Sequence, residues 1–185
     1  MPSQSVPLPW DQSDWLDSAT TWIHTQLATA GREVESITVL HQRPWSTFAR
    51  ISTDQGIVYF KAPAPAFRYE AALTQLLAHR YPACTTPLLA IEPEQGWLLT
   101  VDAGITLNEI DPTPTQVEHW VALLPRYVEL QMAMVRQVPE LLAAGMPDRR
   151  LTTLPNLYQE LLQDREALLI GQESGLTTEE YQRLQ

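Results

Sequence analysis

Two short apolar segments joined by a glycine-containing link limit the folds that this chain can adopt. Residues 48–53 and 57–62 are rich in β-branched and aromatic side chains, and Asp54-Gln55-Gly56 separates them. A three-residue link with a glycine is typical of a β-hairpin, so the two segments predict neighbouring antiparallel strands. Pro63 and Pro65 follow at once and end the second strand, because proline has no backbone N–H to donate.

The remaining elements surround this hairpin. Strands are predicted over residues 37–40, 88–92 and 97–101. Helices are predicted between Asp14 and Gly31, over 67–81, over 115–138 with a kink or restart at Pro125, over 154–167, and from Thr177. Antiparallel hairpins with one inserted helix favour an α+β fold over a parallel α/β sheet. We therefore expect a five-stranded, mainly antiparallel sheet with helix 67–81 packed on it, followed by helices only.

Composition narrows the class of protein. The chain has 185 residues, 44% of them hydrophobic, and a formal charge of −10, which favours a folded domain and disfavours nucleic acid as a partner. No apolar run reaches the ~18 residues of a membrane span, and the first ten residues lack a signal-peptide pattern, so we expect a cytoplasmic protein without a membrane partner. Cys84 is the only cysteine, which excludes an internal disulfide. Arg149 and Arg150 suit either an anion site or pairing with surface carboxylates, and we favour pairing.

The only lysine stands in an unusual place. Eleven of the twelve basic residues are arginine, and Lys61 lies inside the apolar segment 57–62. Glu70, nine positions on, falls on the stripe of the following helix that also carries Leu73 and Leu77. The helix would fold back and bring Glu70 over Lys61, in an ion pair that orients the lysine towards nucleotide phosphates. The alternative is a lysine that protects a strand edge and a glutamate favoured near a helix N-terminus, and spacing alone leaves both open.

Two other segments give weaker indications of a ligand-binding site. Residues 43–47 lie where the first strand turns into the second, so Ser46 or Thr47 could offer hydroxyls to a ligand. The tract lacks the glycines of a phosphate-binding loop, and an ordinary polar hairpin loop fits it as well. Residues 96–104 run from an apolar strand into a glycine-containing link, whose backbone could bind a planar base. A buried strand followed by a turn fits the same residues.

Taken in order, four segments resemble the aminoglycoside phosphotransferase family, a small-molecule branch of the protein-kinase-like fold. They are RPWSTFARISTDQGIVYFKA, FRYEAALTQLL, TPLLAIEPEQGWLLTVDAGITL, and YVELQ followed by LLAAGMPDRRLTTL. No single motif is decisive, whereas the order of all four is fairly specific. The resemblance covers about residues 14 to 185 and concerns the N-terminal portion of that family.

The resemblance implies a nucleotide site. Lys61 matches the lysine that contacts the α- and β-phosphates, and Glu70 matches its helix partner. Ser46 and Thr47 match the nucleotide-positioning loop. The hinge whose backbone holds the adenine is matched by Leu99, Thr100, Val101 and Asp102. The implied cofactor is ATP or GTP, and the implied partners are this nucleotide and a small-molecule substrate.

The chain also departs from the family. The segment H-G-D-x-x-x-x-N, which supplies the catalytic aspartate and a metal-binding asparagine, is absent, as is the following Mg²⁺-binding aspartate. We therefore expect no catalytic or metal-ligating residue in this chain, and Mg²⁺ only in a full-length protein. The predicted function is the N-terminal part of a kinase that phosphorylates a small-molecule hydroxyl, with this chain alone inactive. Aminoglycoside, choline-like, homoserine-like and sugar-like acceptors stay open. The alternative is a non-catalytic, pseudokinase-like binding or regulatory module.

The expected organisation has three parts. Residues 1–31 form an amphipathic helix, 32–104 a nucleotide-binding lobe and hinge, and 105–185 the start of a helical lobe. A helix that opens at Thr177 and stops at Gln185 suggests a truncated chain, with a frayed tail as the alternative. The helices of a truncated lobe would expose apolar faces, so self-association through these faces is expected.

Overall fold

The computed structural model describes residues 8–110, 116–165, 167–172 and 174–185. Thr115, which was expected to cap a helix, lies outside these residues. Contacts divide the described chain into two units, one within residues 8–146 and one within residues 147–185. The boundary expected after residue 104 therefore falls inside the first unit, and the N-terminal helix, which was expected to be a separate part, belongs to the same unit.

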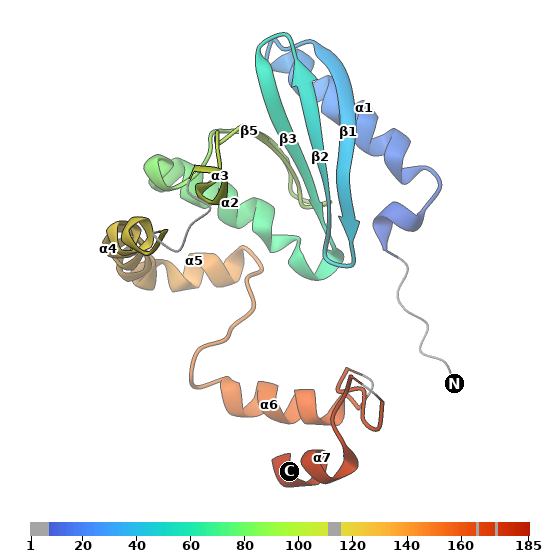
Figure 1. The fold of residues 1–185 in the computed structure, drawn as a ribbon, viewed down its shortest axis with the longest axis vertical. Helices are drawn as coiled ribbons and strands as arrows, with labels where there is room; N and C mark the ends of the chain where they lie inside the picture. The colour runs from blue at the N-terminus through green and yellow to red at the C-terminus, as the bar shows by residue number, and fades with distance from the viewer. Residues whose placement is uncertain (1–7, 111–115, 166, 173) are drawn as a thin grey trace. The chain divides into compact units, whose positions relative to one another are not determined.

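The first unit is built on a single sheet (Figure 1). Its strands are β1 (Val34–Arg43), β2 (Ser46–Thr53), β3 (Gly56–Pro63), β4 (Leu88–Glu92) and β5 (Trp97–Val101). Their order is β1-β2-β3-β5-β4, and every pair of neighbours is antiparallel. The predicted α+β fold with a five-stranded antiparallel sheet is confirmed. Only β1 differs clearly from its prediction over residues 37–40, because pairing with β2 extends it at both ends.

The helices follow the predicted order with shifted boundaries. They are α1 (Trp15–Thr29), α2 (Tyr69–Arg80), α3 (Leu107–Ile110), α4 (Gln116–Met134), α5 (Val138–Ala143), α6 (Leu154–Gln163) and α7 (Thr178–Leu184). Short 3-10 helices are η1 (Pro9–Asp11), η2 (Pro65–Phe67), η3 (Pro82–Cys84) and η4 (Val135–Gln137). None of the helices in the described part of the chain is both long and apolar enough to cross a bilayer.

Two helix predictions differ in detail from the structure. Of the kink or restart predicted at Pro125, the restart does not occur, because α4 continues through this residue and divides only at η4. A proline inside a helix removes one hydrogen bond, whereas a restart would leave several backbone groups without partners. The helix α6 ends at Gln163 instead of Ala167, because Asp164 leaves the helical conformation and its N–H closes the last turn on the Glu160 and Leu161 carbonyls.

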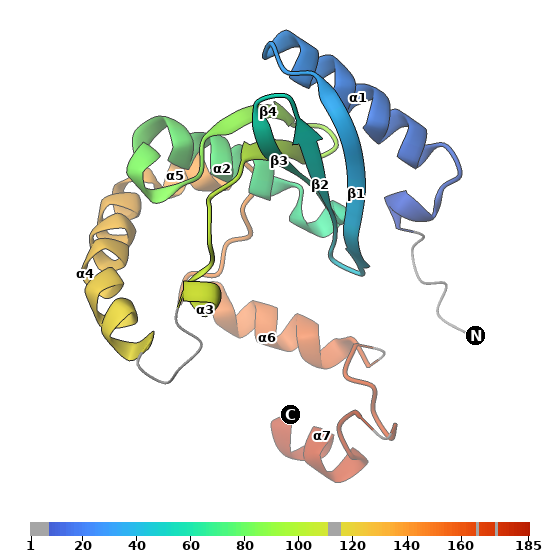
Figure 2. The same ribbon diagram turned by 45° about the horizontal axis from the view of Figure 1, so that its top comes forward.

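The core lies between the sheet and α1, which runs along one face of it (Figure 2). On α1, Trp15, Ala19, Ile23 and Leu27 recur at helical spacing, and all four are buried. The core positions of the sheet are Ala49, Ile51, Val58, Phe60, Ala62, Trp97 and Leu99. Because side chains alternate along a strand, these residues leave Tyr59 and Lys61 on the opposite face.

We predict that Leu27→Ala destabilises the first unit by about 2–5 kcal/mol, since it removes a large side chain from a closely packed site. Leu27 is fully buried, whereas Leu16 on the same helix is 53% exposed. Leu16→Ala is therefore the matched control and should change the free energy of unfolding by less than about 1 kcal/mol. Urea unfolding of the two variants measures the difference, and equal effects would show that α1 is not part of the core.

Candidate functional site

Lys61 and Glu70 meet in an ion pair on the sheet face opposite α1. Lys61 stands near the end of β3, and Glu70 lies in the first turn of α2. The Lys61 Nζ is 2.5 Å from Glu70 Oε2, and the two side chains are 32% and 31% exposed. The short segment between β3 and α2 contains Pro63 and Pro65, which end the strand and lead into η2. The predicted contact is confirmed, and the ammonium remains accessible from solvent.

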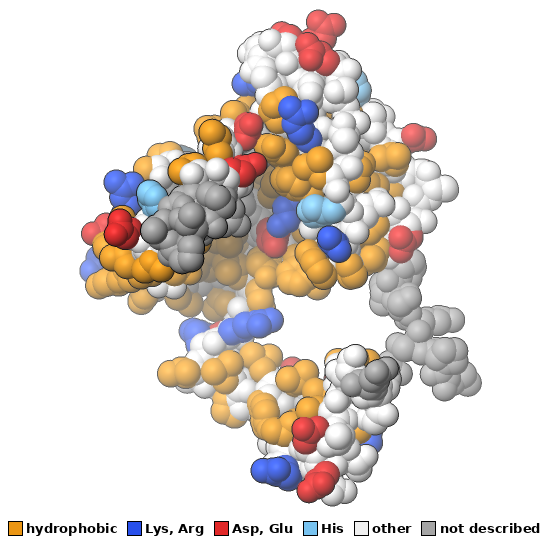
Figure 3. All heavy atoms as spheres, in the orientation of Figure 1, with side chains coloured by type: hydrophobic (Ala, Val, Ile, Leu, Met, Phe, Trp, Pro, Cys, Tyr) orange, Lys and Arg blue, Asp and Glu red, His pale blue; other side chains and the backbone are white. Residues whose placement is uncertain are grey.

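Cross-strand pairing brings further residues to this face. Lys61 lies opposite Phe48 on β2 and opposite Leu98 on β5. Tyr59, two positions before Lys61, lies opposite Arg50 and Thr100. In the space-filling view, basic, acidic and histidine side chains lie close together among hydrophobic ones over β1 to β3 (Figure 3).

Three aromatic rings form a ladder across this face. His41, Phe48 and Tyr59 come from β1, β2 and β3, and their ring planes are nearly parallel. The ring centroids are 5.6 Å apart between His41 and Phe48, and 5.2 Å apart between Phe48 and Tyr59. On the next strand the residue opposite Tyr59 is Thr100, which is too small to continue the ladder. Tyr59 is therefore the last ring of the ladder, and it is half-buried.

This ladder could not be predicted from the sequence. Its members are far apart in the chain and become neighbours only through the register of three strands. The available signal was the alternation around Lys61, which already places Tyr59 on the lysine face. The same reasoning becomes possible for Phe48 and His41 only when the partner residues are known.

Ser46 and Thr47 do not lie in a loop. The turn between β1 and β2 consists of Pro44 and Trp45, and both hydroxyl residues belong to β2 and are buried. Thr47 pairs with Ala62 and therefore faces α1, away from Lys61. Of the two hydroxyl residues that could have faced a ligand beside Lys61, Thr47 therefore does not, because adjacent residues of a strand point to opposite faces.

Ser46 has the opposite orientation. It pairs with Pro63, two positions beyond Lys61, and so shares the lysine face. Its side chain is nevertheless only 3% exposed. Trp45, in the turn just before Ser46, is exposed, and its carbonyl accepts a hydrogen bond from the Ala64 N–H at 2.8 Å.

The four predicted hinge residues divide between the two faces of the sheet. Leu99 is fully buried in the core, whereas Thr100 lies beside Tyr59 on the lysine face. The Val101 N–H donates to the Pro87 carbonyl at 2.9 Å, and the Asp102 N–H donates to the Ile57 carbonyl at 3.2 Å. These two donors are therefore already used within the sheet.

The next residues are less constrained. Asp102 accepts a hydrogen bond from the Gly104 N–H at 2.9 Å through Oδ1. Among the hydrogen bonds of the described residues, the Ala103 N–H has no partner, which makes it the first backbone donor after β5 that a ligand can use. A cleft of about 600 Å³ opens beside Asp102 and Ala103, with Leu123 and Arg126 of α4 on its other side. Its lining includes neither Lys61 nor Glu70.

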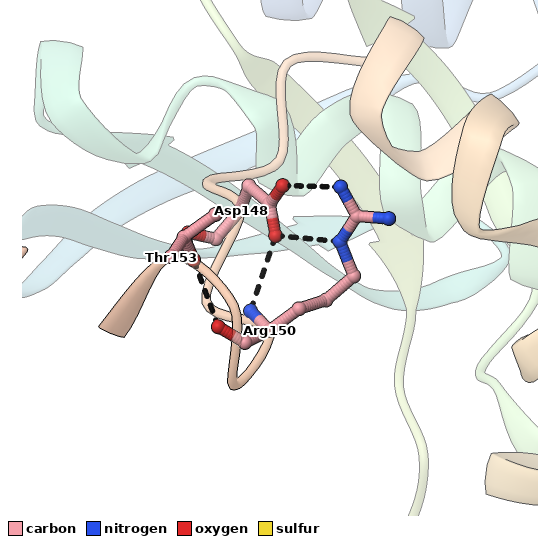
Figure 4. Close-up of polar contacts among 3 residues, drawn as sticks. All are labelled: Asp148, Arg150 and Thr153. Atoms are coloured by element: carbon pink, nitrogen blue, oxygen red, sulfur yellow. Dashed lines mark hydrogen bonds and ion pairs between the residues drawn. The ribbon is translucent and has the colours of Figure 1, made fainter. Parts of the chain in front are cut away.

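In the second unit, Asp148 and Arg150 form a tight local pair at the start of α6 (Figure 4). The Arg150 guanidinium donates to both Asp148 carboxylate oxygens, at 2.8 and 2.5 Å, and the Arg150 backbone N–H donates to Oδ1 at 3.1 Å. The Thr153 hydroxyl contacts the carbonyl oxygens of both residues. The expected pairing of this arginine with a carboxylate is confirmed.

These hydrogen bonds stabilise the ionised form of Asp148. Its pKa falls to about 2, chiefly because the Arg150 side chain donates to the carboxylate, with a further contribution from the Arg150 backbone N–H. The Arg150 side chain is thus engaged in hydrogen bonds within this turn. Elsewhere in the described residues, no three His, Cys, Asp or Glu side chains gather in a way that could hold a metal ion.

Comparison with protein-family models, with curated proteins and with solved structures finds no match to this chain.

We predict that an NMR titration of Asp148 gives a pKa of about 2. Arg150→Gln should raise it towards the ordinary value of about 3.9, and Arg149→Gln is the matched control that should leave it low. Because the folded-state pKa is depressed, the stabilisation that the pair provides is present above about pH 4 and is lost as the pH falls through 2. An unshifted Asp148 in the native protein would contradict the contact.

Proposed function

We propose that this chain is the nucleotide-binding portion of an ATP- or GTP-dependent small-molecule kinase of the aminoglycoside phosphotransferase type. The observation that carries the proposal is the ion pair between Lys61 on β3 and Glu70 on α2. The chain connections add support, because α2 is inserted between β3 and β4 of a sheet ordered β1-β2-β3-β5-β4. This is the arrangement that the resemblance implies for a kinase-like N-terminal lobe.

The ion pair suits phosphate binding because it orients the Lys61 ammonium. Glu70 holds the lysine in one direction, and about two thirds of each side chain is shielded from solvent. A lysine ammonium has three donors, so it can contact a phosphate oxygen while one donor stays with the carboxylate. A pair this close to solvent adds little net stability, which makes a positioning role a better explanation than a structural one.

The aromatic ladder suits the base of the nucleotide. Tyr59, the last ring of the ladder, lies opposite Thr100 and two residues along β3 from Lys61, and we propose that the base stacks on it. A planar base stacked there would have its sugar and phosphates within reach of the lysine, and the Ala103 N–H follows the same strand as a hydrogen-bond donor. Every base offers a π-face, so stacking alone favours neither ATP nor GTP.

Phosphoryl transfer needs more than these residues. The described residues hold no group of ligands for Mg²⁺, and the family's catalytic segment is absent from the sequence. The chain therefore does not fit the metal by itself, and we derive no transfer step from it. In the proposed kinase, the acceptor is a hydroxyl of a small molecule, and this chain supplies nucleotide binding.

We predict weak ATP binding by the wild-type chain and a loss of at least about tenfold in affinity for Lys61→Ala, since a hydrogen bond to a charged group is removed. Arg183→Ala on α7 is the matched control, because it removes one positive charge from an exposed helix in the second unit. Isothermal titration calorimetry with ATP, with and without Mg²⁺, measures both. Equal binding by Lys61→Ala and wild type would contradict the site.

Turnover assays with amino-alcohol and aminoglycoside acceptors should show no phosphotransfer by the wild-type chain. Activity that survives purification and disappears in Lys61→Ala would show that the catalytic residues lie within these 185 residues after all.

We also predict that Tyr59→Leu weakens ATP and adenosine binding by about five- to tenfold, because the substitution keeps an apolar side chain and removes the stacking ring. Binding of inorganic tripolyphosphate should stay unchanged. His41→Leu is the control, since it shortens the ladder at its other end. An equal loss for both variants would point to a general change of the sheet face and not to a base on Tyr59.

A further inference from the structure

Helix α2 is weakly held by apolar packing. Of its twelve residues only Ala71 is buried, and the others are half-buried or exposed. The orientation of such a helix depends strongly on contacts at its two ends. The orientation matters because Glu70, the partner of Lys61, stands one residue before Ala71.

The N-terminal end of α2 is fixed by the sheet. Besides the ion pair of Glu70 with Lys61, the turn between β4 and β5 approaches the backbone that leads into the helix. A Cβ atom on Gly96 would lie 2.9 Å from the Arg68 Cα, and Gly96 has a φ of +74°. Only glycine permits both this conformation and this approach, so Ala71 and Gly96 together make the N-terminal end a pivot.

The C-terminal end of α2 is fixed by a different part of the chain. Arg80 contacts Glu140 of α5, with 2.7 Å between Nη2 and Oε2 and 3.0 Å between Nη2 and Oε1. Tyr81, the next residue, accepts a hydrogen bond from the Gln137 side chain of η4 at 2.9 Å. Both partners come from one short segment, 56 and 60 residues further along the chain.

We propose that these two contacts act as a clamp that positions α2 and thereby sets how often Glu70 holds Lys61. Arg80, Tyr81, Gln137 and Glu140 are positioning residues in this scheme, because none of them touches the lysine. Movement of the segment Val135–Ala143 would be transmitted through α2 to the ion pair.

The geometry of a helix makes the coupling effective. A side-chain tip lies about 5 Å from the helix axis, so a rotation of about 20° about this axis moves it by about 2 Å. A shift of that size would carry the Glu70 carboxylate from its 2.5 Å contact beyond the reach of the lysine. The clamp resists such a rotation because two successive residues are held, Arg80 at the end of α2 by α5 and Tyr81 directly after it by η4.

The sole lysine gives a direct test that needs no nucleotide. A chain labelled with ¹³C,¹⁵N-lysine has one side-chain signal, from Lys61. The wild type defines the chemical shift of the paired lysine, and Glu70→Gln defines that of the lysine without its carboxylate partner. We expect Glu140→Ala and Tyr81→Phe each to move the signal towards the Glu70→Gln value, as the ratio of paired to unpaired lysine falls about two- to fivefold.

Two controls separate positioning from general effects. Glu129→Ala removes an exposed glutamate of α4 and should leave the Lys61 signal in place. The exchange Arg80→Glu with Glu140→Arg reverses the ion pair and should restore the wild-type signal. An unchanged Lys61 signal in both clamp variants, or failure of the exchange to restore it, would overturn the clamp. The nucleotide titrations of Lys61→Ala do not bear on this result, so the two proposals fail separately.

Discussion

The alternation of side chains along β3 governs the structure of the first unit. Val58, Phe60 and Ala62 point into the core under α1, which forces Tyr59 and Lys61 to the opposite face. A slip of one residue in the register would bury the ammonium against α1 and expose Phe60, so apolar burial on one face fixes the chemistry on the other. Because β3 pairs with both β2 and β5, its register also places Phe48, Leu98 and Thr100 around the lysine.

Local signals explain which predictions succeeded. The bounds of β4 and β5 are as predicted, since Pro87 and the Pro93–Gly96 turn limit both segments in the sequence itself. The contact between Lys61 and Glu70 could be predicted from the sequence, because a short proline-containing link leaves the helix few ways to fold back. The N-terminal cap of α7 could be predicted as well, because Thr177 and Glu180 form both hydrogen bonds of the capping box within four residues.

The predictions that failed did so for two other reasons. Two features depend on the pairing register between strands, which no single segment of the chain specifies. They are the face of the sheet on which Thr47 lies and the ladder of His41, Phe48 and Tyr59. The end of α6 depends on the backbone conformation of Asp164, a residue that is compatible with a helix or with its termination. Sequence patterns thus predicted the elements well, and the site only where two partners lie close in the chain.

The second unit is held together in another way. Among its described residues only Tyr181 is buried, while Leu154, Leu157 and Leu161 of α6 are exposed. A segment of fewer than about 40 residues rarely buries enough surface to be stable alone. Hydrogen bonds, ion pairs and cation–π contacts therefore contribute a larger share of the stability of this unit. They include the Asp148–Arg150 pair, the hydrogen bond from the Tyr181 hydroxyl to the Leu162 carbonyl at 2.8 Å, and Arg165 stacked over the Tyr181 ring.

Electrostatics limits what the lysine face can bind without help. Lys61 is neutralised by Glu70, and the chain as a whole carries a charge of −10, so a triphosphate would meet little net attraction. Arg50, exposed and opposite Tyr59, is the next cation on the same face. The ion pair therefore contributes to phosphate binding mainly by orienting the Lys61 ammonium, and little by adding net positive charge. In the function we propose, affinity must come mainly from the base on the aromatic ladder, with Arg50 as a further cation on this face, which is why we expect binding to be weak and to depend on Tyr59 as much as on Lys61.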